Sequence, residues 1–168
     1  MSSSSIQLAV FDVDGVLTDG RLFLLDNGQE MKAFHARDGL GLKGLMQFGI
    51  EVAIITARQA PLVAQRVTEL GISHYISGRE DKETALMELA RQLKLSHDAI
   101  AYMGDDLVDW PAMRHCGATC APCDGDAWLR TQVNYVTKAR GGQGAAREWA
   151  EKILATEGVL DQWRAQFQ

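Results

Sequence analysis

The chain has 168 residues, of which 46% are hydrophobic and 23% are charged, and its net charge is −5 at pH 7. This length and composition are typical of one folded domain with a buried core, so we expect a single domain over residues 1–168. The acidic balance, without any run of lysine or arginine, argues against a nucleic-acid partner.

The sequence shows neither a membrane-spanning segment nor a secretory leader. No apolar stretch reaches the roughly 18 residues that a membrane-spanning helix needs. The N-terminus also lacks the basic start, apolar core and cleavage site of a secretory leader. We therefore expect a cytoplasmic protein without a membrane partner, and the serine run within residues 1–5 predicts a frayed terminus.

Three cysteines lie close together at Cys116, Cys120 and Cys123. In a cytoplasmic protein they are expected to be reduced thiols, here small residues around a turn. A metal site that includes His115 is the alternative, but no second cluster of ligands completes a tetrahedral set.

The predicted elements alternate between strand and helix along most of the chain. A continuous apolar strand such as EVAIIT is typical of a parallel sheet that is covered on both faces. We therefore predict an α/β fold, with a Rossmann-like parallel sheet and helices on both faces. In chain order, strands are predicted at residues 6–11, 51–56, 74–77, 99–104, 116–121 and 134–137, and helices at residues 40–48, 60–70, 81–93 and 144–154.

The segment between the first strand and the first helix breaks this alternation. Two apolar runs, residues 22–25 and 31–34, flank the tripeptide Asp26-Asn27-Gly28, and Asn-Gly between apolar runs is a strong hairpin signal. A β-hairpin over about residues 22–34 is therefore predicted to project from the domain. Its apolar residues need a partner surface, and association with other subunits is one way to bury them.

Polar side chains follow the predicted strands at the points where the strands end. Ligands of a parallel sheet bind at the carboxyl ends of its strands, so we expect these side chains to converge. Crowded carboxylates repel one another, and Mg²⁺, which prefers oxygen ligands, relieves that repulsion. The residues are Asp12 and Asp14 after the first strand, Thr56 after the second, Lys82 after the third, and Asp105, Asp106 and Asp109 after the fourth.

This set of residues suits phosphoryl transfer, which depends on positioning and on charge neutralisation. Asp12 can act as a nucleophile and form an acyl-phosphate, while Asp14 protonates the leaving oxygen and later deprotonates water. Mg²⁺ and Lys82 offset the phosphate charge, and Thr56 can donate a hydrogen bond to it. Acidic residues after a strand are also common helix caps. It is the convergence of four segments that favours the catalytic interpretation.

Several segments also resemble a known family. DVDGVLTDG (12–20), IITAR (54–58), Lys82 and GDDLVDW (104–110) resemble the four motifs of the haloacid dehalogenase superfamily. KAFHARDGLG (32–41), GDDLVDWPAM (104–113) and ARGGQGAARE (139–148) resemble one branch, the 3-deoxy-D-manno-octulosonate 8-phosphate phosphatases. The resemblance implies a Mg²⁺-dependent phosphatase that acts on an eight-carbon acidic sugar in lipopolysaccharide precursor synthesis. It also implies a Rossmann-like core without a large cap domain.

The resemblance assigns a role to each matching residue. Asp12 is implied to be the nucleophile and a metal ligand, and Asp14 the general acid/base that binds the metal through its carbonyl. Asp105 is the other implied carboxylate ligand, with Asp106 and Asp109 in support, while Thr56 and Lys82 are implied to bind phosphate. The implied substrate-binding residues are Asp14, His35, Ala36, Arg37, Asp38, Gly39, Lys43, Arg58, Arg66 and Lys82.

Three residues depart from the pattern of that family. His35 stands where asparagine is expected, Lys43 where arginine is common, and Ala57 where glycine is usual. These positions concern substrate recognition and the loop beside Thr56 rather than the nucleophile or the metal ligands. We expect His35 to be a neutral hydrogen-bonding side chain, and a pH-sensitive substrate contact is the alternative.

The resemblance further implies a homotetramer. In that family the hairpins of four subunits form a barrel, a neighbouring subunit closes each site, and the segment after residues 141–144 reaches an adjacent site. Three other functions are weighed: a phosphatase for a nine-carbon sugar acid 9-phosphate of the sialic acid type, a non-catalytic oligomerisation module, and a phosphotransferase. The last usually needs a cap domain, for which the spacing between Asp14 and Thr56 leaves no room.

Overall fold

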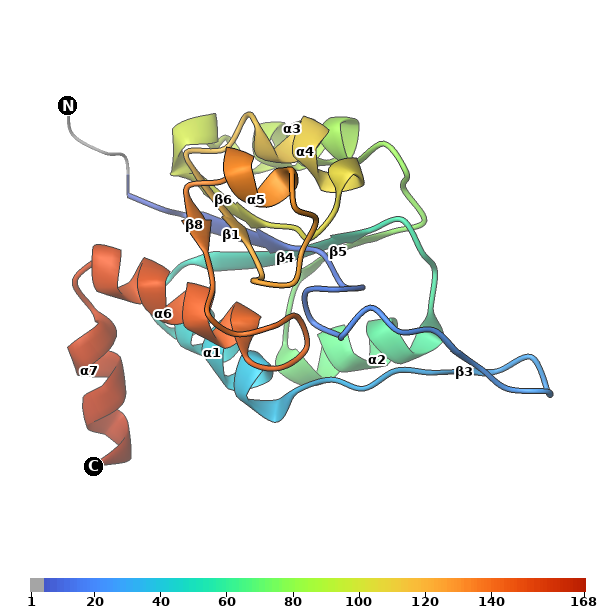
Figure 1. Cartoon of the computed structure of the whole chain (residues 1–168). Helices are drawn as coiled ribbons and strands as arrows, with labels where there is room; N and C mark the ends of the chain where they lie inside the picture. The colour runs from blue at the N-terminus through green and yellow to red at the C-terminus, as the bar shows by residue number, and fades with distance from the viewer. Residues whose placement is uncertain (1–4) are drawn as a thin grey trace.

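A six-stranded parallel sheet forms the centre of the computed structural model, which describes residues 5–168 (Figure 1). Most of the frayed terminus predicted at residues 1–5 lies outside the described residues. The strands are arranged in the order β5-β4-β1-β6-β7-β8, and every neighbouring pair is parallel. Their bounds are β1 Leu8–Phe11, β4 Glu51–Thr56, β5 His74–Ser77, β6 Ile100–Met103, β7 Ala118–Ala121 and β8 Tyr135–Val136.

Helices cover both faces of this sheet, which confirms the predicted fold class. Figure 1 shows α3, α4 and α5 above the sheet and α1, α2 and α6 below it. Successive side chains of β1 enter different cores: Ala9 and Phe11 pack in one cluster and Leu8 and Val10 in the other. This alternation with a period of two is why a strand between two helical layers must be apolar throughout. The helices are α1 Ala36–Gln47, α2 Pro61–Leu70, α3 Lys82–Leu93, α4 Trp110–Met113, α5 Leu129–Gln132, α6 Ala145–Thr156 and α7 Leu160–Arg164.

Helix α1 begins at Ala36, four residues before the predicted start. Its first two turns contain Gly39 and Gly41, and glycine is a poor helix former, which hid the true start from sequence reasoning. His35 is the N-cap, because its Nδ1 accepts a hydrogen bond from the Arg37 backbone N–H at 3.2 Å. The glycines allow α6 to approach closely: a Cβ at Gly41 would lie 3.0 Å from the Arg147 Cα. The short helices α4, α5 and α7 were also not predicted.

The predicted hairpin is present and projects from the domain, to the right in Figure 1. Its paired strands are shorter than predicted, since β2 (Phe23–Leu24) and β3 (Glu30–Met31) make only two residue pairs. Gly28 has φ +78°, a left-handed conformation that favours glycine at this turn. The hairpin exposes apolar side chains, at Leu22, Phe23, Leu24, Leu25 and Met31.

The C-terminal segment packs on the same chain. Trp163 in α7 is 1% exposed, and its ring lies against α1 where a Cβ on Gly44 would be only 2.7 Å away. The Arg147 guanidinium lies 4.5 Å from the centre of the same ring, within the range of a cation–π contact. Helix α7, which belongs to the segment after residues 141–144, therefore packs against its own subunit.

Two sequence expectations concern smaller features. Cys116, Cys120 and Cys123 are free thiols, and Cys120 is buried. Over residues 5–168, none of the helices is both long and apolar enough to cross a membrane.

Replacing Trp163 with alanine tests the docking of α7. Loss of a fully buried tryptophan should lower the free energy of unfolding by about 3–5 kcal/mol. Phe167→Ala is the matched control, because Phe167 is 62% exposed and should cost less than about 1 kcal/mol. Urea unfolding measures both variants. If both variants lower the free energy of unfolding by the same small amount, α7 does not dock on α1 in solution.

Candidate active site

The carboxyl edge of the sheet brings together residues from four distant segments. Asp12 follows β1, Thr56 ends β4, Lys82 begins α3 after β5, and Asp105 follows β6. Because β4, β1 and β6 are neighbours in the sheet, these side chains meet at one place. Asp12, Thr56 and Lys82 are all buried, with exposed fractions of 6%, 3% and 3%. The predicted convergence at the strand ends is therefore present.

Lys82 is the cation at the centre of this edge. Its Nζ lies 2.8 Å from Oδ1 of Asp12 and 2.7 Å from Oδ1 of Asp109. Burial alone lowers the pKa of Lys82, but the two carboxylates outweigh this effect and raise the pKa, so the ammonium stays charged. Lys82 thus presents a fixed positive charge beside the Asp12 carboxylate.

Asp109 holds the surrounding groups in place. Its side chain is fully buried, and its Oδ1 receives hydrogen bonds from Lys82 and, at 3.5 Å, from the Tyr102 hydroxyl. Its Oδ2 accepts hydrogen bonds from the backbone N–H groups of Asp105 and Asp106, at 3.1 and 3.3 Å. Both oxygens are therefore occupied, and Asp109 fixes the loop that carries Asp105.

The acidic cluster fits a divalent cation. One carboxylate oxygen from each of Asp12, Asp105 and Asp109 lies within 4.8 Å of the others. Burial, followed by the charge of Asp109, raises the pKa of Asp12 to about 7, although Lys82 partly offsets these effects. Burial, followed by the charges of Asp109 and Asp12, raises the pKa of Asp105 to about 8. Three carboxylates facing one ammonium leave excess negative charge, which a hard cation would neutralise.

Two glycine contacts shape the loop that follows β1. A Cβ on Gly15 would overlap the Asp105 carboxylate, and Gly15 has φ +89°, so only glycine suits this position. From the other side, Gly142 donates a backbone hydrogen bond to the Val16 carbonyl at 2.9 Å. A Cβ on Gly141 would overlap the Gly15 carbonyl. The glycine-rich segment 141–144 therefore packs directly on the loop that carries Asp12 and Asp14.

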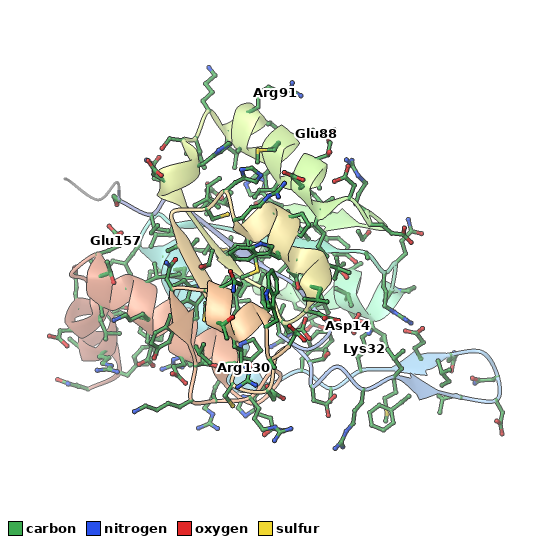
Figure 2. The ribbon with its side chains drawn as sticks, turned by 45° about the horizontal axis from the view of Figure 1, so that its top comes forward. Asp14, Lys32, Glu88, Arg91, Arg130 and Glu157 are labelled. Atoms are coloured by element: carbon green, nitrogen blue, oxygen red, sulfur yellow. The ribbon has the colours of Figure 1, made fainter. Side chains whose placement is uncertain are left out.

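Asp14 points away from the acidic cluster, toward the hairpin. Its carboxylate pairs with Lys32, and its Oδ2 lies 3.9 Å from Nε of Arg58. Figure 2 shows Asp14 and Lys32 together at the base of the hairpin. Arg58 also pairs with Glu30 of β3. Sequence reasoning gave Lys32 no role, although it opens the motif at residues 32–41.

The other implied substrate contacts lie along α1 and α2. His35 caps α1, and Ala36, Arg37 and Lys43 are exposed on it. The Asp38 carboxylate is buried and accepts hydrogen bonds from the backbone N–H groups of Gly144 and Arg147, at 3.3 and 2.8 Å, so it holds the start of α6. Gly39 and Arg66 line one small pocket together with His35. None of these residues belongs to the acidic cluster.

Open space lies on the hairpin side, where Lys32, the partner of Asp14, lines it. A cavity of about 540 Å³ extends between the hairpin and the start of α2. A ligand of sugar size would fit in it beside the base of the hairpin. Its lining residues are Gly28, Gln29, Glu30, Lys32, Gln59, Ala60, Pro61 and Leu62.

The chain is similar to known phosphatases over almost its entire length. It is 42% identical to the 3-deoxy-D-manno-octulosonate 8-phosphate phosphatase of Escherichia coli over 164 residues, covering 98% of this chain and 87% of the relative. The chain belongs to this phosphatase family. No protein-family model matches it. The predicted superfamily and family, and membership among the phosphomonoester hydrolases, are thus confirmed.

Solved structures of relatives agree with this assignment. The phosphatase from Moraxella catarrhalis, in complex with magnesium, phosphate and KDO, has a TM-score of 0.96 and 43% identity, covering 99% of this chain and 95% of that one. The cobalt-bound phosphatase from Haemophilus influenzae has a TM-score of 0.90 and 41% identity, covering 93% of this chain and 91% of that one. The magnesium in the Moraxella relative and the acidic cluster of this chain together bear out the predicted Mg²⁺ cofactor.

The raised pKa values give a testable dependence of metal binding on pH. The folded chain keeps protons on Asp12 and Asp105 up to about pH 7 and 8, whereas the unfolded chain loses them near 3.8. The folded state therefore binds more protons in this window, and these two groups lower the free energy of unfolding as the pH rises. Mg²⁺ relieves the repulsion, so it should raise the melting temperature of chelator-treated protein more at pH 8.5 than at pH 5.5.

Thermal unfolding with and without Mg²⁺ at the two pH values measures this effect. Asp105→Asn is the control, because it removes one carboxylate and should abolish most of the Mg²⁺ effect. A Mg²⁺ effect of equal size at both pH values would contradict the carboxylate assignment.

Proposed function

We propose that this chain hydrolyses 3-deoxy-D-manno-octulosonate 8-phosphate to the free sugar acid and phosphate, as a cytoplasmic enzyme of lipopolysaccharide precursor synthesis. The observation that carries the proposal is the Asp12–Lys82–Asp109 cluster with Asp105 beside it, at the carboxyl edge of the sheet. A relative of 43% identity was solved in complex with magnesium, phosphate and KDO, which supports the proposal. We treat residues 1–168 as the catalytic domain.

The first chemical step transfers the phosphoryl group to the enzyme. An Asp12 carboxylate oxygen attacks phosphorus, the bond from phosphorus to the sugar oxygen breaks, and the Asp14 carboxyl gives its proton to that oxygen. Lys82 offsets the charge that gathers on the phosphoryl oxygens, and the Thr56 hydroxyl donates a hydrogen bond to one of them. Bound Mg²⁺, held by Asp12, Asp105 and the Asp14 carbonyl, would supply further charge neutralisation.

The second step regenerates the enzyme. A water oxygen attacks the same phosphorus, the bond to Asp12 breaks, and the water proton passes to Asp14. Both steps need the Asp14 carboxyl near the leaving or attacking oxygen, on the side opposite Asp12. Its separation from the acidic cluster supports this division of labour, because a carboxylate used as a metal ligand could not shuttle the proton.

Basic side chains near Asp14 and along α1 and α2 are proposed to bind the substrate. Arg58 beside Asp14 is suited to the carboxylate or phosphate of the substrate, because a guanidinium binds such groups through two parallel hydrogen bonds. Further along α1 and α2, His35, Arg37, Lys43 and Arg66 would recognise the sugar acid. Asp38 and Gly39 would act mainly by shaping α1, since the Asp38 carboxylate is engaged by α6.

A homotetramer is proposed for the assembly. The hairpin exposes large apolar side chains, among them Leu24 at 72%, and an isolated two-stranded hairpin is marginal in water. Pairing with hairpins of other subunits would bury these residues and bring a neighbour close to Asp14. The neighbour would thereby take the place of a cap domain.

Two other functions are weaker candidates. A phosphatase for a nine-carbon sugar acid phosphate would use the same cluster and would differ only at the residues that contact the sugar. A non-catalytic oligomerisation module is disfavoured because Asp12, Lys82 and Asp105 are all present and lie together at one edge of the sheet.

Phosphate release from a panel of sugar phosphates tests the proposed reaction. The eight-carbon substrate should have the highest kcat/KM, and Asp12→Asn should lower kcat by on the order of 10³ or more, because the nucleophile is lost. Asp98→Asn, remote from the cluster on the 3₁₀ turn His97–Ala99, is the matched control. Higher kcat/KM for nine-carbon substrates would contradict the substrate assignment, and full activity of Asp12→Asn would contradict the mechanism.

Solution mass tests the proposed assembly. The wild type should have the mass of four subunits, and Leu24→Asp should dissociate it, because a charge would be buried in an apolar contact. Arg91→Asp on α3, away from the hairpin in Figure 2, should leave the mass unchanged. A fully active wild-type monomer would refute closure of the site by neighbours.

A further inference from the structure

We propose that Lys32, at the base of the hairpin, is the positioning residue that holds the Asp14 carboxyl where it protonates the leaving group. Lys32 follows β3 directly, and its ammonium pairs with Oδ1 of Asp14. Its side chain is only 2% exposed, whereas that of Asp14 is 21% exposed. The inference rests on the proposed function, because it concerns a step of that reaction.

The burial of Lys32 makes this pair a strong constraint. A surface ion pair is weak because water competes for both partners, but a buried ammonium that loses its partner costs several kcal/mol. Asp14 is the one carboxylate paired with Lys32 among the described residues. Releasing Asp14 would leave the Lys32 ammonium buried and without a partner. The ammonium donates to Oδ1, which can accept that hydrogen bond whether or not Oδ2 carries the proton, so the carboxyl group is held in one orientation.

The hairpin also acts on the same carboxylate indirectly, through Arg58. Glu30 precedes Lys32 by two residues, so the extended backbone directs both side chains to the same face, while Met31 between them is 51% exposed. Glu30 pairs with Arg58, whose Nε lies 3.9 Å from Oδ2 of Asp14. Arg58 is 41% exposed, so this contact is looser than that of Lys32. Of the two cations beside Asp14, Lys32 rather than Arg58 therefore fixes the carboxylate.

This arrangement makes one chemical step depend on the hairpin. As the bond from phosphorus to the sugar oxygen breaks, that oxygen needs the Asp14 proton, because an alkoxide is a poor leaving group. A nitrophenolate leaves without a proton, so the same bond breaks in 4-nitrophenyl phosphate whether or not Asp14 is in place. The ratio between the two substrates therefore isolates the position of Asp14.

The test compares Lys32→Met and Lys32→Arg with the wild type on both substrates. In Lys32→Met, kcat/KM for the sugar acid phosphate should fall about 10- to 100-fold, the effect of displacing a catalytic group by about 1 Å. For 4-nitrophenyl phosphate it should change less than about threefold, and the fall for the sugar should lie in kcat rather than KM. Lys32→Arg should restore most of the activity, and Lys152→Met on α6 should behave as the wild type.

A double-mutant cycle removes any ambiguity from folding. Asp14→Asn already lacks the proton donor, so adding Lys32→Met to it should cost no further activity on the sugar phosphate. Equal losses on both substrates, or additive losses in the cycle, would show a merely structural role and overturn the inference. A rise in KM with unchanged kcat would overturn it in favour of direct substrate binding.

The outcome is separable from that of the proposed function. If the wild type prefers a different alkyl phosphate, the substrate assignment fails. The leaving-group comparison is then made with the preferred substrate. If Lys32→Met lowers kcat/KM by the same factor for the preferred alkyl phosphate and for 4-nitrophenyl phosphate, the role of Lys32 is still refuted.

Discussion

The pairing of one buried lysine with two buried aspartates is the constraint on which the rest of the site depends. Lys82 contacts both Asp12 and Asp109, and its charge is what allows two carboxylates to remain in an interior of low polarity. Asp105 adds a third carboxylate that Lys82 does not contact. The raised pKa values of Asp12 and Asp105 express this excess negative charge. A divalent cation and a phosphate group can enter together because the cation removes that excess.

The backbone of the fold sets the positions of these carboxylates and leaves their side chains little freedom. Asp12 and Asp105 follow neighbouring strands, so the spacing of the sheet sets their separation. Asp109 turns the loop after β6 back on itself by accepting the N–H groups of Asp105 and Asp106. The glycine-rich segment 141–144 braces the loop after β1 from the opposite side. Catalysis of phosphoryl transfer depends on this fixed placement of charge.

Sequence reasoning found the residues whose positions follow from strand ends. Asp12, Thr56 and Lys82 could be placed because parallel strands bring their carboxyl ends to one edge. Lys32 could not be found in this way, because its contact with Asp14 depends on where the base of the hairpin lies relative to the loop after β1. Likewise, resemblance gave Asp38 a substrate role but could not reveal that its carboxylate holds the start of α6. Contacts between distant segments are determined by packing, which no local pattern encodes.

The central claim is that the phosphoryl group is transferred to Asp12. Rapid acid quenching during turnover, followed by mass spectrometry of peptides, tests this claim most directly. The peptide that contains Asp12 should carry the mass of one phosphoryl group, and the modification should disappear when substrate is omitted. A phosphoryl group on a different residue would contradict the account. So would its absence during turnover of 4-nitrophenyl phosphate by Asp14→Asn, in which only the second step should be slowed.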